Sequence, residues 1–134
     1  MLPLDGGFVQ KRLSILIVED EPVIALGLSF AAEDAGAEVI GPFDSIADAL
    51  ALLDKASVDA AILDVNLRDR DITPVILALL GRAVPFVVQT GTALPPEVAA
   101  AYPDIPVMSK PSAPDAVVTR LLQAIGGSEA IPAA

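Results

Sequence analysis

The chain has 134 residues, the length of one ordinary domain, so we expect one hydrophobic core and one functional site. Its 18 acidic and 8 basic residues give a formal net charge of −10, which excludes the usual basic surface for nucleic acid and disfavours anionic membranes. Cysteine and histidine are absent, which excludes disulfides, thiol nucleophiles, the usual zinc and copper sites, and Ser-His or Cys-His catalytic pairs. Any chemistry that the chain performs must therefore use carboxylates, hydroxyls and lysine.

The sequence shows no signal for secretion or membrane insertion. Its N-terminal segment, MLPLDGGFVQKR, places the basic pair after the few apolar residues, which is the reverse of a signal peptide. Charged residues interrupt every apolar stretch before it reaches the ~18 residues of a spanning helix. We therefore expect a soluble, cytoplasmic protein.

Short β-branched runs alternate with longer helical patterns along the chain. The expected strand and helix pairs are 13–18 with 22–35, 38–40 with 45–55, 60–64 with 73–80, 86–90 with 95–102, and 107–109 with 113–124. This alternation predicts an α/β domain in which helices cover both faces of a parallel sheet. The expected organisation is a flexible N-terminal extension (1–12), the domain (13–125) and a C-terminal tail (126–134).

Helix boundaries carry local signals. Pro22 suits the first turn of its helix, and Thr73, Ser45 and Ser112 are candidate N-caps. Glycines suited to the position after a helix are Gly36 and Gly81. The face of the first helix that we expect to be apolar is formed by Val23, Leu26, Leu28 and Phe30.

Polar residues follow four of the five expected strands. Asp64 ends the third, Thr90 ends the fourth, and Lys110 follows the fifth, whereas three acidic residues follow the first: Glu19, Asp20 and Glu21. Ligands of open parallel sheets bind beyond the carboxyl ends of the strands, so these side chains should converge. Neighbouring carboxylates repel and need a cation, and oxygen ligands favour Mg²⁺. A hydroxyl and an ammonium group suit phosphoryl oxygens.

Each residue also has an ordinary structural explanation. The acidic run could simply favour the positive end of a helix, the Thr90-Gly91 step could belong to a turn, and the Lys110-Pro111 pair could be exposed by chance. Their joint position at the ends of four strands favours a site instead. The sequence therefore predicts a magnesium-dependent phosphoryl site that lacks histidine.

From Leu13 to about Ala124 the sequence resembles a receiver domain of the two-component response-regulator family. The motifs that carry the resemblance are ILIVEDEP, AAILDVN, VVQTG and the SKP that ends the fifth strand. The resemblance implies a flavodoxin-like (βα)5 fold with strand order 2-1-3-4-5. It also implies that Asp64 accepts a phosphoryl group from a sensor histidine kinase or a phosphotransfer protein.

The same resemblance implies roles for the other site residues. Asp20, Asp64 and the backbone carbonyl of Asn66 would bind Mg²⁺, with Glu19 in the acidic pocket. Thr90 would follow the phosphoryl group during switching. The remaining implied features are a Lys110 that pairs with the phosphoryl group and a cis peptide bond before Pro111.

Residues 85–91, PFVVQTG, further resemble the PFxFATG signature of single-domain receivers that work with sensor kinases of the HWE class. Val88, Gln89 and Thr92 depart from that pattern. Val107 occupies the position of the usual switch aromatic, and Ser112 replaces the usual phenylalanine after Lys-Pro. We therefore do not expect the usual rotation of an aromatic side chain.

The leading hypothesis is a stand-alone, non-enzymatic receiver that signals to an unknown downstream protein, because the chain ends soon after the last expected helix. The alternative is a receiver-like module that docks a partner without phosphorylation. A haloacid-dehalogenase type of enzyme would require aspartate where Asn66 stands, and a flavin site would require a phosphate loop after the first strand. A rim lysine adds little packing, so replacing Lys110 is expected to leave the fold intact while impairing the switch.

Overall fold

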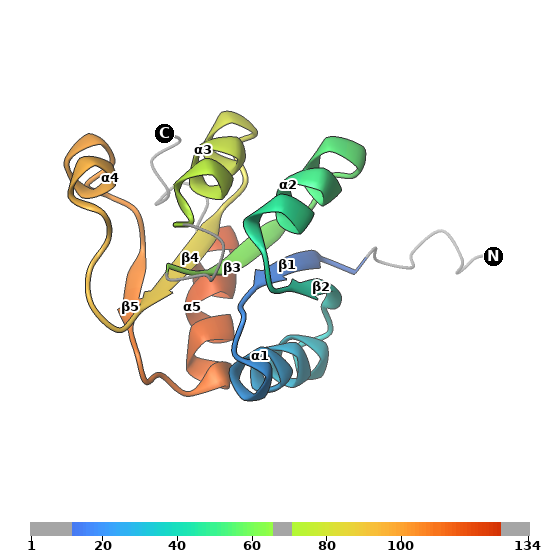
Figure 1. The fold of residues 1–134 in the computed structure, drawn as a ribbon. Helices are drawn as coiled ribbons and strands as arrows, with labels where there is room; N and C mark the ends of the chain where they lie inside the picture. The colour runs from blue at the N-terminus through green and yellow to red at the C-terminus, as the bar shows by residue number, and fades with distance from the viewer. Residues whose placement is uncertain (1–11, 66–70, 127–134) are drawn as a thin grey trace.

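The computed structural model describes residues 12–65 and 71–126 and contains the alternating strands and helices that the sequence predicts (Figure 1). The strands are β1 (Ser14–Val18), β2 (Glu38–Phe43), β3 (Ala60–Asp64), β4 (Phe86–Thr90) and β5 (Val107–Ser109). The helices are α1 (Pro22–Asp34), α2 (Ile46–Lys55), α3 (Thr73–Gly81), α4 (Pro96–Ala101) and α5 (Pro114–Gly126). Within these described ranges, no helix is long and apolar enough to cross a membrane.

The five strands form one parallel sheet in the order β2-β1-β3-β4-β5, which confirms the predicted flavodoxin-like fold. Helices α1 and α5 cover one face, and α2 and α3 cover the other (Figure 1). Except for Arg12 and Gly126, the predicted N-terminal extension and C-terminal tail lie outside the described residues. Gly126 is the last residue of α5.

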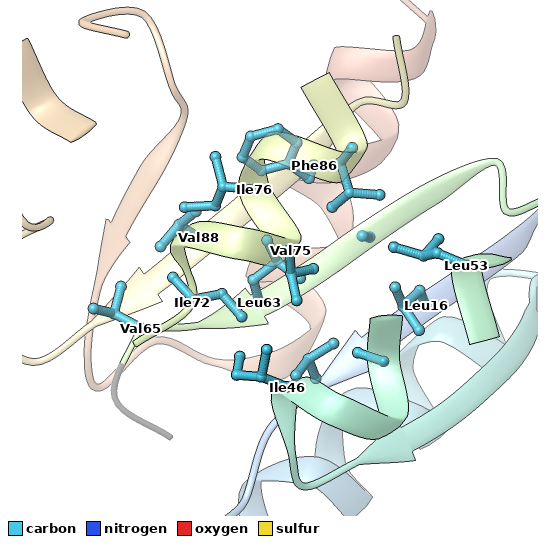
Figure 2. Close-up of a cluster of buried hydrophobic side chains, with 14 of the residues drawn as sticks. Leu16, Ile46, Leu53, Leu63, Val65, Ile72, Val75, Ile76, Phe86 and Val88 are labelled. Atoms are coloured by element: carbon cyan, nitrogen blue, oxygen red, sulfur yellow. The ribbon is translucent and has the colours of Figure 1, made fainter. Parts of the chain in front are cut away.

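Each face of the sheet has its own hydrophobic core. Every residue of β3 and of β4 is buried, as is typical of parallel strands covered on both sides. Figure 2 shows the core under α2 and α3, where Ile46 and Leu53 of α2 pack with Ile76 of α3 against Leu63 and Val88 of the sheet. The core on the other face includes Ile17, Leu28, Ile62, Val87, Val117 and Leu121.

The predicted apolar face of α1 is wrong for three of its four residues. Val23, Leu26 and Phe30 are 84%, 54% and 58% exposed. The helix packs closely against α5 through small side chains. The close approach is evident at Gly27, where an added Cβ atom would lie only 3.0 Å from Cγ of Pro114. The residues that α1 buries are Ala25, Leu28, Ser29 and Ala32.

One of the three predicted N-caps is confirmed. The hydroxyl of Ser45 accepts a hydrogen bond from the backbone N–H of Asp48 at 3.1 Å. Thr73 is instead the first residue of α3, and its N–H donates to the carboxylate of Asp71 at 2.8 Å. Ser112 precedes α5 by two residues, and its hydroxyl donates to the carbonyl oxygen of the last residue of β5.

Helices α1 and α3 are each followed by a residue in the left-handed backbone conformation. That residue is a glycine after α1 but an alanine after α3. Gly36 follows α1 with φ +89°, as predicted. Gly81 is still inside α3, and the left-handed position after that helix is occupied by Ala83 with φ 56°. The N–H of Val84 closes the motif on the carbonyl oxygen of Leu79 at 3.0 Å. The second predicted glycine position is therefore wrong by two residues.

We expect Ala83→Gly to stabilise the protein by about 1 kcal/mol, because glycine adopts a left-handed backbone without strain. Gly81→Ala should add about 0.5–1 kcal/mol, because it favours the helix and its Cβ atom meets nothing within 4 Å. Gly36→Ala is the matched control and should destabilise the protein, because it places an alanine at a left-handed position. Urea unfolding of the three variants measures these changes, and a lower midpoint for Ala83→Gly would contradict the argument.

Candidate phosphoryl-binding site

Three strands bring charged side chains together at the carboxyl edge of the sheet. Nζ of Lys110 lies 3.3 Å from Oε1 of Glu19 and 3.2 Å from Oδ1 of Asp64. It also lies 3.6 Å from Oε1 of Glu21, the third acidic residue of the run after β1. The side chains of Glu19 and Asp64 are almost completely buried. A single ammonium group therefore pairs with three carboxylates.

The acidic side chains also form a suitable cation site. Glu19, Asp20 and Asp64 each present a carboxylate oxygen within 4.8 Å of the others. Oxygen donors at this spacing fit a hard cation such as Mg²⁺. Asn66, whose backbone carbonyl the sequence analysis added to this set, lies outside the described residues.

The environment of Glu19 shifts its ionisation. Burial raises the pKa of the Glu19 carboxyl from 4.5 to about 7, and the charge of Asp64 acts in the same direction. The N–H of Glu21, which donates to Oε2 of Glu19 at 3.1 Å, and the charge of Lys110 oppose that rise. Burial alone would lower the pKa of Lys110, but the carboxylates of Glu19 and Asp64 outweigh it and raise that pKa.

Thr90 lies at the same edge, at the end of β4, and is buried. Its hydroxyl oxygen accepts a hydrogen bond from the N–H of Thr92 at 3.0 Å, so in this state the hydroxyl is held by the following loop. The carbonyl oxygen of Thr90 accepts from the backbone N–H of Lys110 at 2.8 Å, which ties the ends of β4 and β5 together. The bond between Lys110 and Pro111 is cis.

Gln89 is a buried polar residue near this edge that the sequence analysis names only as a departure from the PFxFATG signature. It is the only amide in β4, and it is 2% exposed. Its Nε2 atom has no hydrogen-bond partner among the described residues. The signal in the sequence was an amide residue directly after the apolar run FVV of the fourth strand.

We expect the metal-free protein to lose stability as the pH rises from about 4.5 to about 7. The raised pKa means that folding favours the protonated form of Glu19, so the stabilisation is complete below 4.5 and is lost as the pH passes about 7. The shift corresponds to at most about 3 kcal/mol. Urea unfolding in EDTA at several pH values measures it. Glu19→Gln should flatten this dependence, whereas the exposed control Glu33→Gln should not; equal slopes in both variants would contradict the assignment.

Comparisons with known proteins agree with this geometry. A family model described as "Response regulator receiver domain" matches residues 15–121. The solution structure of SdrG from Sphingomonas melonis Fr1 is 42% identical with a TM-score of 0.72, and the match covers 87% of this chain and 98% of that one. A structure titled as the BeF3-activated conformation of SdrG from Pseudomonas melonis Fr1 matches with 42% identity over the same shares and a TM-score of 0.67.

A more distant structure shows the same fold. The CheY-like receiver domain protein from Methanospirillum hungatei JF-1 is 22% identical, with a TM-score of 0.78 over 90% of this chain and 99% of that one. No curated protein matches the chain. The family match covers both the sheet and the acidic edge, and the chain therefore belongs to the response regulator receiver domain family.

Proposed function

We propose that the protein is a cytoplasmic, non-enzymatic response regulator that accepts a phosphoryl group on Asp64 in a Mg²⁺-dependent reaction. The observation that carries this proposal is the buried Asp64 carboxylate, which lies 3.2 Å from Lys110 and beside Glu19 and Asp20. The donor is a sensor histidine kinase or a phosphotransfer protein. The signal passes to a downstream protein by protein–protein contact.

In the proposed reaction, an oxygen of the Asp64 carboxylate attacks the phosphorus atom of a phosphohistidine. The bond from phosphorus to the donor's nitrogen breaks as the bond to Asp64 forms. Mg²⁺, held by Asp20, Asp64 and the carbonyl of Asn66, would neutralise charge on the phosphoryl oxygens. Lys110 then pairs with the new phosphoryl oxygens, and Thr90 supplies a hydroxyl donor.

We also propose that the protein is a single-domain receiver of the PFxFATG type that works with a kinase of the HWE class. The sequence PFVVQTG at 85–91 supports this, although Val88 and Gln89 depart from the signature. The 42% identity to SdrG, for which a BeF3-activated conformation is described, supports the use of beryllofluoride as a phosphoryl mimic for this chain.

A phosphorylation-independent docking module is the competing hypothesis. Such a module gains nothing from a buried Glu19 that is costly to ionise beside Asp64. It would also have no need of a lysine surrounded by three carboxylates. The arrangement suits a protein that must bind a cation and an added phosphoryl group.

Incubation with acetyl phosphate and Mg²⁺ tests the proposal. Intact-protein mass spectrometry should show a gain of one phosphoryl group, because Asp64 is the buried nucleophile beside Lys110. Asp64→Asn or removal of Mg²⁺ with EDTA should abolish the gain. The control Asp54→Asn, which changes an aspartate with an 81% exposed side chain, should retain it. A full mass gain in Asp64→Asn would refute the assignment of the phosphoacceptor.

A further inference from the structure

The starting observation is the buried side-chain amide of Gln89. Gln89 is 2% exposed, and its Nε2 atom has no hydrogen-bond partner within the described part of the chain. Buried polar groups nearly always have a partner, and one without a partner costs stability. A residue that carries such a cost needs an explanation, such as a partner that arrives only in another state of the protein.

The sheet places this amide beside the phosphoacceptor. Gln89 is the register partner of Asp64 on β3 and of Met108 on β5. Register partners in a parallel sheet project to the same face, so the side chains of Gln89 and Asp64 are neighbours. Two residues earlier, Val87 and Ile62 both belong to the core beneath α1 and α5, which identifies that face.

Lys110 also approaches this position. It follows β5, whereas its partners Asp64 and Glu19 follow β3 and β1. Because β4 lies between β5 and β3, the side chain of Lys110 must cross the end of β4 to make these contacts. Gln89 therefore belongs to the strand that lies between the two groups that the phosphoryl group would rearrange, the Asp64 carboxylate and the Lys110 ammonium.

We propose that Gln89 is a further phosphoryl-binding residue, whose amide N–H groups gain their acceptor when oxygen atoms are added at Asp64. The inference rests on the proposed function. Phosphorylation adds strong acceptor oxygens at a site where Gln89 has a donor without a partner. The glutamine thus lowers the stability of the resting protein and stabilises the phosphorylated one.

This role makes two linked predictions for Gln89→Met, which keeps a similar shape but removes the amide. The resting protein should become more stable, with a Tm raised by about 3 °C, because the unpaired donor is gone. Affinity for beryllofluoride in the presence of Mg²⁺ should fall about tenfold, because the donor to the mimic is gone. Affinity for Mg²⁺ alone should not change. A purely structural glutamine predicts a lower Tm and unchanged beryllofluoride affinity.

Calorimetric titration with beryllofluoride and thermal unfolding of wild type, Gln89→Met and Val87→Ala test these predictions. Val87 is a buried control on the same strand and face, so its variant should lower the Tm without changing beryllofluoride affinity. If Gln89→Met binds beryllofluoride with wild-type affinity, or if its Tm is lowered, this inference is overturned while the proposed function stands. If wild type neither binds beryllofluoride nor accepts a phosphoryl group from acetyl phosphate, the proposed function fails and the inference fails with it.

Discussion

Replacing Lys110 by methionine is expected to destabilise the metal-free protein by about 3 kcal/mol at pH 8. The ammonium group of Lys110 lies within 3.6 Å of three carboxylates, two of them buried. Without it, an ionised Glu19 would face Asp64 as a buried charge of like sign, and the pKa of Glu19 would rise further because the charge of Lys110 no longer opposes the rise. Removing one partner of such a group is far more harmful than removing an exposed salt bridge.

The conditions that reduce this loss identify its cause. Acidification below pH 7 should reduce it, because the pKa of Glu19 is already about 7 and a proton would neutralise that carboxyl. Added Mg²⁺ should reduce it as a replacement cation. Urea unfolding at pH 8 and pH 6, with EDTA or with Mg²⁺, measures the effect. Lys55→Met, at an exposed position in the last turn of α2, is the control; an equal loss in both variants would contradict the argument.

This expectation differs from the one drawn from the sequence, in which a rim lysine adds little packing and can be replaced without harm to the fold. The difference lies in Glu19, whose side chain is 1% exposed in the folded protein. Three consecutive acidic residues after a strand are ordinarily solvated, and no sequence pattern indicates that one of them is buried. The ion pair between Lys110 and Glu21 depends on the same folded geometry.

The layered fold could be predicted because buried parallel strands are recognisable as continuous apolar runs. The runs at 60–64 and 86–90 match β3 and β4 at both ends. The buried face of α1 could not be predicted in this way, because that helix is apolar on most sides. Its orientation follows from the close approach of Gly27 to Pro114 of α5, a tertiary contact.

The residues of the site were predicted from their positions at strand ends, but their contacts were not. The carboxyl ends of parallel strands meet at one edge of the sheet, which places Asp64 and Lys110 together. Whether the Nε2 atom of Gln89 finds a hydrogen-bond partner depends on how the described side chains around it pack. The bond between Thr90 and Thr92 depends on the conformation of one loop. Such details follow from packing rather than from sequence periodicity.

We expect the segment 91–102 to change its order when a phosphoryl mimic binds, because of the contact between Thr90 and Thr92. The hydroxyl of Thr90 now accepts a hydrogen bond from the N–H of Thr92 at 3.0 Å. If that hydroxyl moves toward Asp64 to donate to a phosphoryl oxygen, its oxygen moves away from the N–H of Thr92, which then loses its acceptor. The loop after β4 must then rearrange to satisfy it.

The neighbouring structure is suited to such a rearrangement. Helix α4 has six residues, and Val98 is its only buried one. Val107, at the position of the usual switch aromatic, is 44% exposed and is too short and too stiff at χ1 to fill space vacated by Thr90. A segment with so little burial opens at low free energy, so its ordering can carry the signal in place of a rotating ring.

Amide hydrogen exchange with and without beryllofluoride should therefore show its largest change, about tenfold or more, in residues 91–102. Thr90→Val removes the hydroxyl but keeps the shape of the side chain, so it should abolish the change in that segment. Thr92→Val is the matched control, because it removes only the 3.5 Å contact between the two hydroxyls and retains the backbone N–H that donates to Thr90. Exchange that changes only in α1, or changes in 91–102 that persist in Thr90→Val, would show that the signal leaves the site by a route independent of the Thr90 hydroxyl.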